Sequence, residues 1–169
     1  MIRPLLAALA MMTTLDSALA QAIPDAATQE VLIKTTLMSF NDANVTGNYA
    51  VFHARLAKPF RDQFSPEKLK TTFKTFAEKE VDIGFVVAKA PIPDAEVKID
   101  DNGVLRIDGH FDTQPSQIAY TLKFIRSDGD WKAVGIDVNI GKPPAKDAPP
   151  PAAAKPPASA ESGKIQFGK

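Results

Sequence analysis

Three ionisable side chains, Asp108, His110 and Asp112, alternate along one stretch of the sequence. In an extended strand, residues two apart project from the same face, so the imidazole and both carboxylates would share one side of a sheet. A histidine beside carboxylates suits general acid–base chemistry or a metal site. However, residues two apart lie about 6.6 Å from each other along a strand, too far to converge on one ion or proton. We therefore predict a solvated strand face, with no catalytic residue and no metal ligand.

The second histidine, His53, follows Tyr49 by one helical turn. Residues four apart on a helix are neighbours, so the two side chains can lie together. One interpretation places them at the mouth of a pocket, with Tyr120 from the sheet and with Phe40 and Asn44 from an earlier helix. In the alternative, His53 lies at a helix end, where a partly charged imidazole is favoured, and binds nothing.

A set of apolar residues predicts an interface on the outward face of the sheet. The candidates are Val104, Ile125 and Trp131, side by side on three strands, with Ala133 beyond them. An apolar patch on an open face suggests a partner, and tryptophan is favoured at interface centres. This patch predicts a homodimer, while the alternative is that a tail or loop of the same chain covers Trp131.

The stretch from Ala95 to Ile140 must position these residues, and its alternation predicts four antiparallel strands with one buried face. Turns with a glycine bulge are expected at Asp101-Asn102-Gly103 and at Ser127-Asp128-Gly129, with a four-residue loop at Thr113–Ser116. This register sets Phe111 opposite Ile118, Gly109 opposite Tyr120, and Leu122 opposite Val134. The predicted inward set is Val97, Ile99, Leu105, Ile107, Gly109, Phe111, Ile118, Tyr120, Leu122, Phe124, Val134, Ile136, Val138 and Ile140.

Three helices are predicted before these strands. The first runs from Asp25 to Val45 and ends at Gly47, and the second runs from Tyr49 to Leu56. The third begins with Ser65 as N-cap and Pro66 at its first position. The alternation in Val81–Val87 predicts one additional strand. Helices followed by an antiparallel sheet with one apolar face indicate an α+β fold.

The first twenty residues predict a secretory signal peptide. Arg3 precedes an apolar run, and Ala18-Leu19-Ala20 has the small residues of a cleavage site. We expect an exported, periplasmic or secreted protein that is cleaved near Ala20. The alternative is an apolar first helix of a cytosolic protein. No other apolar run has membrane length, so stable membrane insertion is not expected. The chain has no cysteine, which excludes disulfides and a cysteine-linked lipid anchor.

The last segment, residues 142–169, differs in composition from the domain predicted for residues 21–141. It is rich in proline, alanine and lysine, which predicts a disordered tail. The tail is interpreted as a spacer, with Ile165-Gln166-Phe167 as an alternative ligand segment. The chain carries 20 basic and 20 acidic residues without a clustered basic face, so nucleic acid is not an expected partner.

Several motifs resemble the nuclear-transport-factor-2-like superfamily, and more narrowly its small exported bacterial members. The resemblance covers about Ala26 to Ile140. It rests on Gly47-Asn48-Tyr49-Ala50-Val51-Phe52-His53, Phe60-Arg61, Gly103-Val104-Leu105-Arg106-Ile107-Asp108-Gly109 and Asp128-Gly129-Asp130-Trp131-Lys132. It implies a cystatin-like roll in which a curved sheet wraps a long helix into a cone, and dimerisation through the sheet. Enzymes of the superfamily use carboxylates, Tyr or His inside the cone.

The predicted inward face has Tyr120 as its one polar-tipped member, so no strand carboxylate could act there as a general acid or base. The sequence therefore favours a non-catalytic binding or interaction module that dimerises through its sheet, without a cofactor. One alternative is a carrier or enzyme that binds a small apolar ligand in a pocket between the first helices and the sheet. A second is an envelope accessory protein that recruits partners by its tail.

Overall fold

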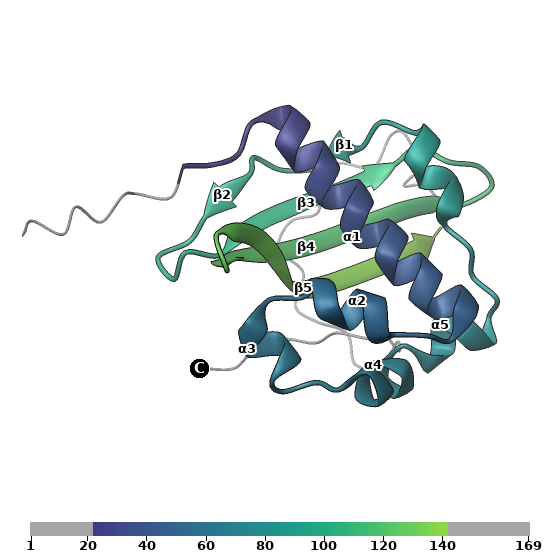
Figure 1. Cartoon of the computed structure of the whole chain (residues 1–169). Helices are drawn as coiled ribbons and strands as arrows, with labels where there is room; N and C mark the ends of the chain where they lie inside the picture. The colour runs from purple at the N-terminus through teal and green to yellow at the C-terminus, as the bar shows by residue number, and fades with distance from the viewer. Residues whose placement is uncertain (1–21, 142–169) are drawn as a thin grey trace, which may run out of the picture.

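The computed structural model describes residues 22–141 as helices packed against one face of an antiparallel sheet, which is an α+β arrangement (Figure 1). The helices are α1 (Ala26–Thr46), α2 (Ala50–Arg55), α3 (Lys58–Arg61), α4 (Pro66–Thr72), α5 (Lys74–Glu78) and the 3-10 helix η1 (Gly84–Ala88). The strands are β1 (Ile92–Pro93), β2 (Lys98–Ile99), β3 (Leu105–Phe111), β4 (Gln117–Ser127) and β5 (Asp130–Gly141). The predicted signal peptide and tail lie outside the described residues.

The long helix α1 begins and ends within one residue of its predicted limits. The Asp25 side chain accepts a hydrogen bond from the Thr28 N–H at 2.7 Å, which caps the first turn. Gly47 ends the helix in the left-handed conformation, with φ 68°. In Figure 1, α1 crosses the strands diagonally, and it buries Ile33, Leu37 and Phe40.

The predicted start of the third helix is also confirmed, because Ser65 caps α4 by accepting the Lys68 N–H at 3.2 Å. The predicted strand Val81–Val87 is wrong, since this segment contains η1. Its burial repeats every three residues, with Ile83 and Val86 buried and the residues next to them partly or fully exposed.

Side chains, rather than a neighbouring strand, satisfy the backbone at the start of η1. The buried Asn41 of α1 accepts the Ile83 N–H at 2.8 Å and donates to Asp82 at 2.9 Å. Asp82 also accepts the Gly84 N–H, and this bond, with the one from Asn41, holds the pKa of its carboxyl below the usual value. These contacts tie η1 to α1 and replace the hydrogen bonds that a strand would have required.

The sheet has the order β3-β4-β5, and both β1 and β2 pair with the free side of β3. The predicted pairing of β3 with β4 is confirmed, with Phe111 opposite Ile118 and Gly109 opposite Tyr120. On the other side of β3, Leu105 pairs with Ile99 of β2.

The predicted turn between β4 and β5 is wrong. A two-residue turn replaces the three-residue loop, so Ser127 pairs with Asp130 and Arg126 pairs with Trp131. Asp128 and Gly129 both have positive φ, at 56° and 86°. Two such residues give the turn a twist that matches the strands.

A β-bulge then shifts the register of β5 by one residue. Phe124 pairs with Ala133, but Lys123 pairs with Gly135, which leaves Val134 as the extra residue. Beyond the bulge, Leu122 faces Ile136 instead of the predicted Val134. The two halves of β5 therefore follow different registers, and this decides which residues face the helices.

Aromatic rings fill the space between the helices and the sheet. Phe40 of α1 makes edge-to-face contacts with Phe52, Phe73 and Phe76, with ring centroids 4.9 to 5.8 Å apart. Phe111 and the other inward residues of β3 and β4 are also buried. Among the helices described between residues 22 and 141, none combines the length and apolar character needed to cross a bilayer.

Candidate functional site

Three of the predicted pocket residues lie together, but they bond to one another inside the core. The Tyr49 hydroxyl donates to the Asn44 side-chain oxygen, and the Asn44 amide donates to the Phe40 carbonyl at 2.8 Å. All three side chains are buried, and burial raises the pKa of Tyr49 to about 12. Their polar groups are thus used to join the end of α1 to the start of α2.

The other two pocket candidates lie elsewhere in the molecule. A ring nitrogen of His53 is 3.2 Å from the Arg61 carbonyl oxygen, so this histidine links α2 to α3. Tyr120 is 4% exposed and places its hydroxyl over Gly109 of β3. None of the five predicted pocket residues lines the two hollows described below.

The predicted interface patch is not one surface. Because the tight turn pairs Trp131 with Arg126 and Ala133 with Phe124, both residues lie on the helix side of the sheet. Trp131 is 9% exposed and Ala133 is 5% exposed. Ile125 pairs with Lys132 on the outer face, and Val104 precedes the outward Arg106 by two residues, so these two partly exposed side chains remain there.

Two adjoining hollows follow the N-terminal half of α1 along the start of β5, and we call them together the α1–β5 groove. They share Leu32, Asp130 and Trp131, and their volumes are about 330 Å³ and 540 Å³. Each volume falls in the range of small-ligand sites. The first hollow is lined by Val31, Leu32, Thr35, Thr36, Ser39, Phe52, Ala54, Arg55, Leu56, Phe124, Asp130, Trp131, Lys132 and Ala133. The second is lined by Ala22, Ile23, Pro24, Asp25, Thr28, Leu32, Arg126, Asp130 and Trp131.

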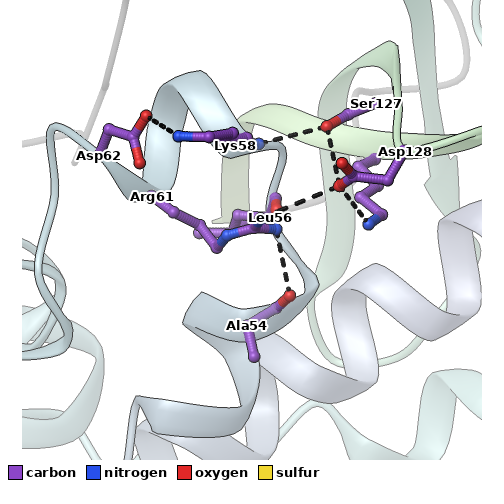
Figure 2. Close-up of polar contacts among 8 residues, drawn as sticks. Ala54, Leu56, Lys58, Arg61, Asp62, Ser127 and Asp128 are labelled. Atoms are coloured by element: carbon purple, nitrogen blue, oxygen red, sulfur yellow. Dashed lines mark hydrogen bonds and ion pairs between the residues drawn. The ribbon is translucent and has the colours of Figure 1, made fainter.

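Arg61 connects the helical wall of the groove to the β4–β5 turn (Figure 2). Its guanidinium donates to the Leu56 carbonyl at 2.5 Å and to the Ala54 carbonyl at 3.4 Å, which are free acceptors at the end of α2. The same side chain lies 3.9 Å from the Asp128 carboxylate, which receives a second ion pair from Lys132 at 2.8 Å. Lys132 and Arg61 hold the pKa of Asp128 below its usual value.

The backbone closes the same junction. The Ala57 N–H donates to the Ala133 carbonyl at 2.9 Å, and Leu56 forms a parallel bridge with Ala133. The Lys58 N–H reaches the Ser127 hydroxyl at 3.4 Å (Figure 2). The groove wall therefore rests on direct contacts between the α2–α3 connection and the edge of β5.

No family model, curated protein or solved structure matches this chain. Its site is thus interpreted from its own geometry.

The chemistry of the groove is that of a binding surface with charged edges. Aliphatic and aromatic side chains form its floor, and threonine and serine hydroxyls of α1 lie along one side. Arg126 lies over the Trp131 ring, with its guanidinium carbon 4.9 Å from the ring centroid. Such a lining binds by burying apolar surface and uses its few polar groups for orientation.

The predicted Asp and His side chains on the outer face of β3 do not converge on one another, because His110 and Asp108 have separate partners. His110 contacts Asp94 at 2.6 Å, whereas Asp108 is bonded to Arg106 at 2.6 and 2.9 Å and to Thr121 at 2.6 Å. Asp112 is exposed. Within residues 22–141, no group of three or more His, Asp or Glu side chains is arranged to hold a metal ion.

Sequence reasoning missed the groove because its location depends on the β4–β5 turn. One signal was available: Asp128-Gly129 is a dipeptide that favours a two-residue turn with positive φ at both positions. With that turn, Trp131 moves to the helix side, where Leu32 on α1 is its neighbour in both hollows.

Proposed function

We propose that this protein is an exported, non-catalytic binding module whose ligand site is the α1–β5 groove. The observation that carries the proposal is the position of Trp131, an almost fully buried aromatic residue shared by both hollows. Export is proposed from the apolar leader and the Ala18-Leu19-Ala20 site. The cone-shaped roll of the nuclear-transport-factor-2-like superfamily is proposed from the sequence motifs, and the α+β layering is consistent with it.

The lining supports binding of a small ligand with an apolar body. Val31 is 62% exposed on α1 and faces the groove together with Leu32, so apolar surface remains available there. Burying such surface contributes about 25 cal/mol per Å². A ligand that covers Val31, Leu32 and Trp131 would therefore gain affinity without any reactive group.

Binding in the groove is tested with an uncharged fluorescent probe, because energy transfer from Trp131 can report when the probe is bound. Trp131 is the only tryptophan of the chain, so excitation energy passed to bound N-phenyl-1-naphthylamine originates in the groove. We expect Val31→Glu to weaken probe binding about fivefold, because the carboxylate replaces roughly 1 kcal/mol of apolar contact. The dissociation constants are read from fluorescence titrations.

Val45→Glu is the matched control. Val45 lies on the same helix and is 60% exposed, but it lines neither hollow. The control variant should bind the probe as the unchanged protein does. Equal weakening by both variants, or no energy transfer from Trp131, would contradict the proposal.

A second candidate function is self-association through the outer sheet face. Val104 and Ile125 remain partly exposed there, and Ile92 pairs with His110 on the same face and is 41% exposed. We expect the purified protein to be dimeric by light scattering, and Ile125→Glu to shift it to a monomer because the new carboxylate would be buried unpaired. A monomeric unchanged protein would refute this candidate.

A further inference from the structure

Two charged side chains of the α1–β5 groove, Arg55 and Asp130, have neither an ion-pair nor a side-chain hydrogen-bond partner among residues 22–141. The other charges lining it are engaged. Lys132 is bonded to Asp128 at 2.8 Å. Arg126 lies over Trp131, and its guanidinium also donates to the Gly129 carbonyl at 2.9 Å. Asp25 accepts the Thr28 N–H and so caps α1.

The fold leaves Arg55 available although it is the last residue of α2. A basic residue at that position would ordinarily bond the free carbonyls of its own helix end. Here Arg61 already donates to the carbonyls of Ala54 and Leu56, on either side of Arg55. The exposed Arg55 side chain lines the first hollow, where it is the positive group without a partner in the described part of the chain.

We infer that the ligand of the groove is a single-chain amphiphile with one carboxylate head, bound by the Arg55 guanidinium. This inference rests on the proposed function and names the class of its ligand. A planar guanidinium matches a carboxylate with two parallel hydrogen bonds. Arg55 is the one cation of the groove without a partner among residues 22–141, so it matches a single carboxylate, and the apolar floor of the hollow suits an alkyl chain.

The charges also fix the direction of the ligand. Arg55 lines only the first hollow. Asp130 lines both hollows and would repel a carboxylate placed where the two hollows meet. The second hollow continues past Trp131 to Ile23 and Pro24. The head therefore lies at Arg55, and the alkyl chain runs over Leu32 and Trp131 towards Ile23.

A comparison of decanoate with 1-decanol separates the contribution of the head group to affinity from that of the alkyl chain. Both are titrated against bound N-phenyl-1-naphthylamine, with the unchanged protein and with the variants Arg55→Gln and Asp130→Asn. We expect Arg55→Gln to weaken decanoate about fivefold and Asp130→Asn to strengthen it about twofold, as for partly exposed charge pairs. Decanol affinity should change with neither variant. Lys89→Gln and Asp112→Asn make the same charge changes at exposed residues outside the groove and should alter neither ligand.

The outcomes distinguish this inference from the proposed function. If both ligands displace the probe but Arg55→Gln leaves decanoate unchanged, or weakens decanol equally, the carboxylate assignment is wrong and the groove remains a binding site. If neither ligand displaces the probe, and excitation of Trp131 gives no energy transfer to the probe, the proposed function and the ligand class fail together.

Discussion

Replacing Phe40 with alanine is expected to lower the free energy of unfolding by about 3–5 kcal/mol. The Phe40 ring is 1% exposed and contacts three other aromatic rings, one each from α2, the α4–α5 junction and α5. Its removal leaves a cavity where α1 meets the shorter helices. Domains of this size are stable by only about 5–15 kcal/mol, so this one change consumes a large part of the total. Urea denaturation followed by circular dichroism measures it.

Phe85→Ala is the matched control for the same chemical change. Phe85 lies on η1 and is 50% exposed, so its truncation should cost less than about 0.5 kcal/mol. A loss at Phe40 no greater than that at Phe85 would show that the aromatic cluster does not hold α1 in place.

Gly109→Ala is the second change with a large expected effect, because no room exists for a single methyl group. A Cβ at this position would lie 2.5 Å from the Tyr120 hydroxyl oxygen and 2.6 Å from the Ile92 carbonyl oxygen. The side chain of Tyr120 could shift, but Ile92 is backbone of β1 and pairs with the residue next to Gly109. We expect a loss of about 1–3 kcal/mol and faster amide exchange in β1.

Two further variants make this prediction specific. Gly135→Ala introduces the same methyl on β5, where the nearest atom is the Lys123 Cβ at 3.3 Å, so a shift of a few tenths of an ångström relieves the contact and the cost should be smaller. Tyr120→Phe combined with Gly109→Ala removes the closest atom but leaves the Ile92 oxygen at 2.6 Å and the ring carbon Cζ of residue 120 at 2.8 Å, and should recover stability only in part. Equal effects of the two glycine variants would contradict the close approach of β1 to β3.

Much of this fold could be predicted from local chemistry. Asp25 and Ser65 are caps whose side chains satisfy free N–H groups, and Gly47 ends α1 because it tolerates positive φ. The pairing of β3 with β4 followed from alternation alone, since a one-residue slip would have exposed Phe111 and its neighbours. In each case the decisive interaction spans only a few residues or one strand pair.

One error arose where a distant contact decides. The apolar alternation around Ile83 suits a strand, but Asn41, some forty residues earlier, supplies the hydrogen bond that holds this segment as a 3-10 helix. The error in β5 was local instead, because the tight turn and the Val134 bulge each shift the register by one residue. Beyond the bulge the two shifts add to two residues, so Ile136 and Val138 keep their predicted inward face, but Leu122 pairs with Ile136 in place of the predicted Val134. Before the bulge only the turn acts, so Trp131 and Ala133 lie on the face opposite to the predicted one.

This pair of irregularities has an evolutionary consequence. In a related chain whose turn took Asp130 as a third residue, Val134 would enter the ladder opposite Phe124, and Gly135–Gly141 would keep their present pairing with β4. The counterpart of Trp131 would then pair with Ser127 and project from the opposite face of the sheet, so the groove would lose its aromatic floor. Homologues could therefore gain or lose this site through substitutions that change the length of this turn, without any insertion or deletion and with the rest of the sheet inherited intact.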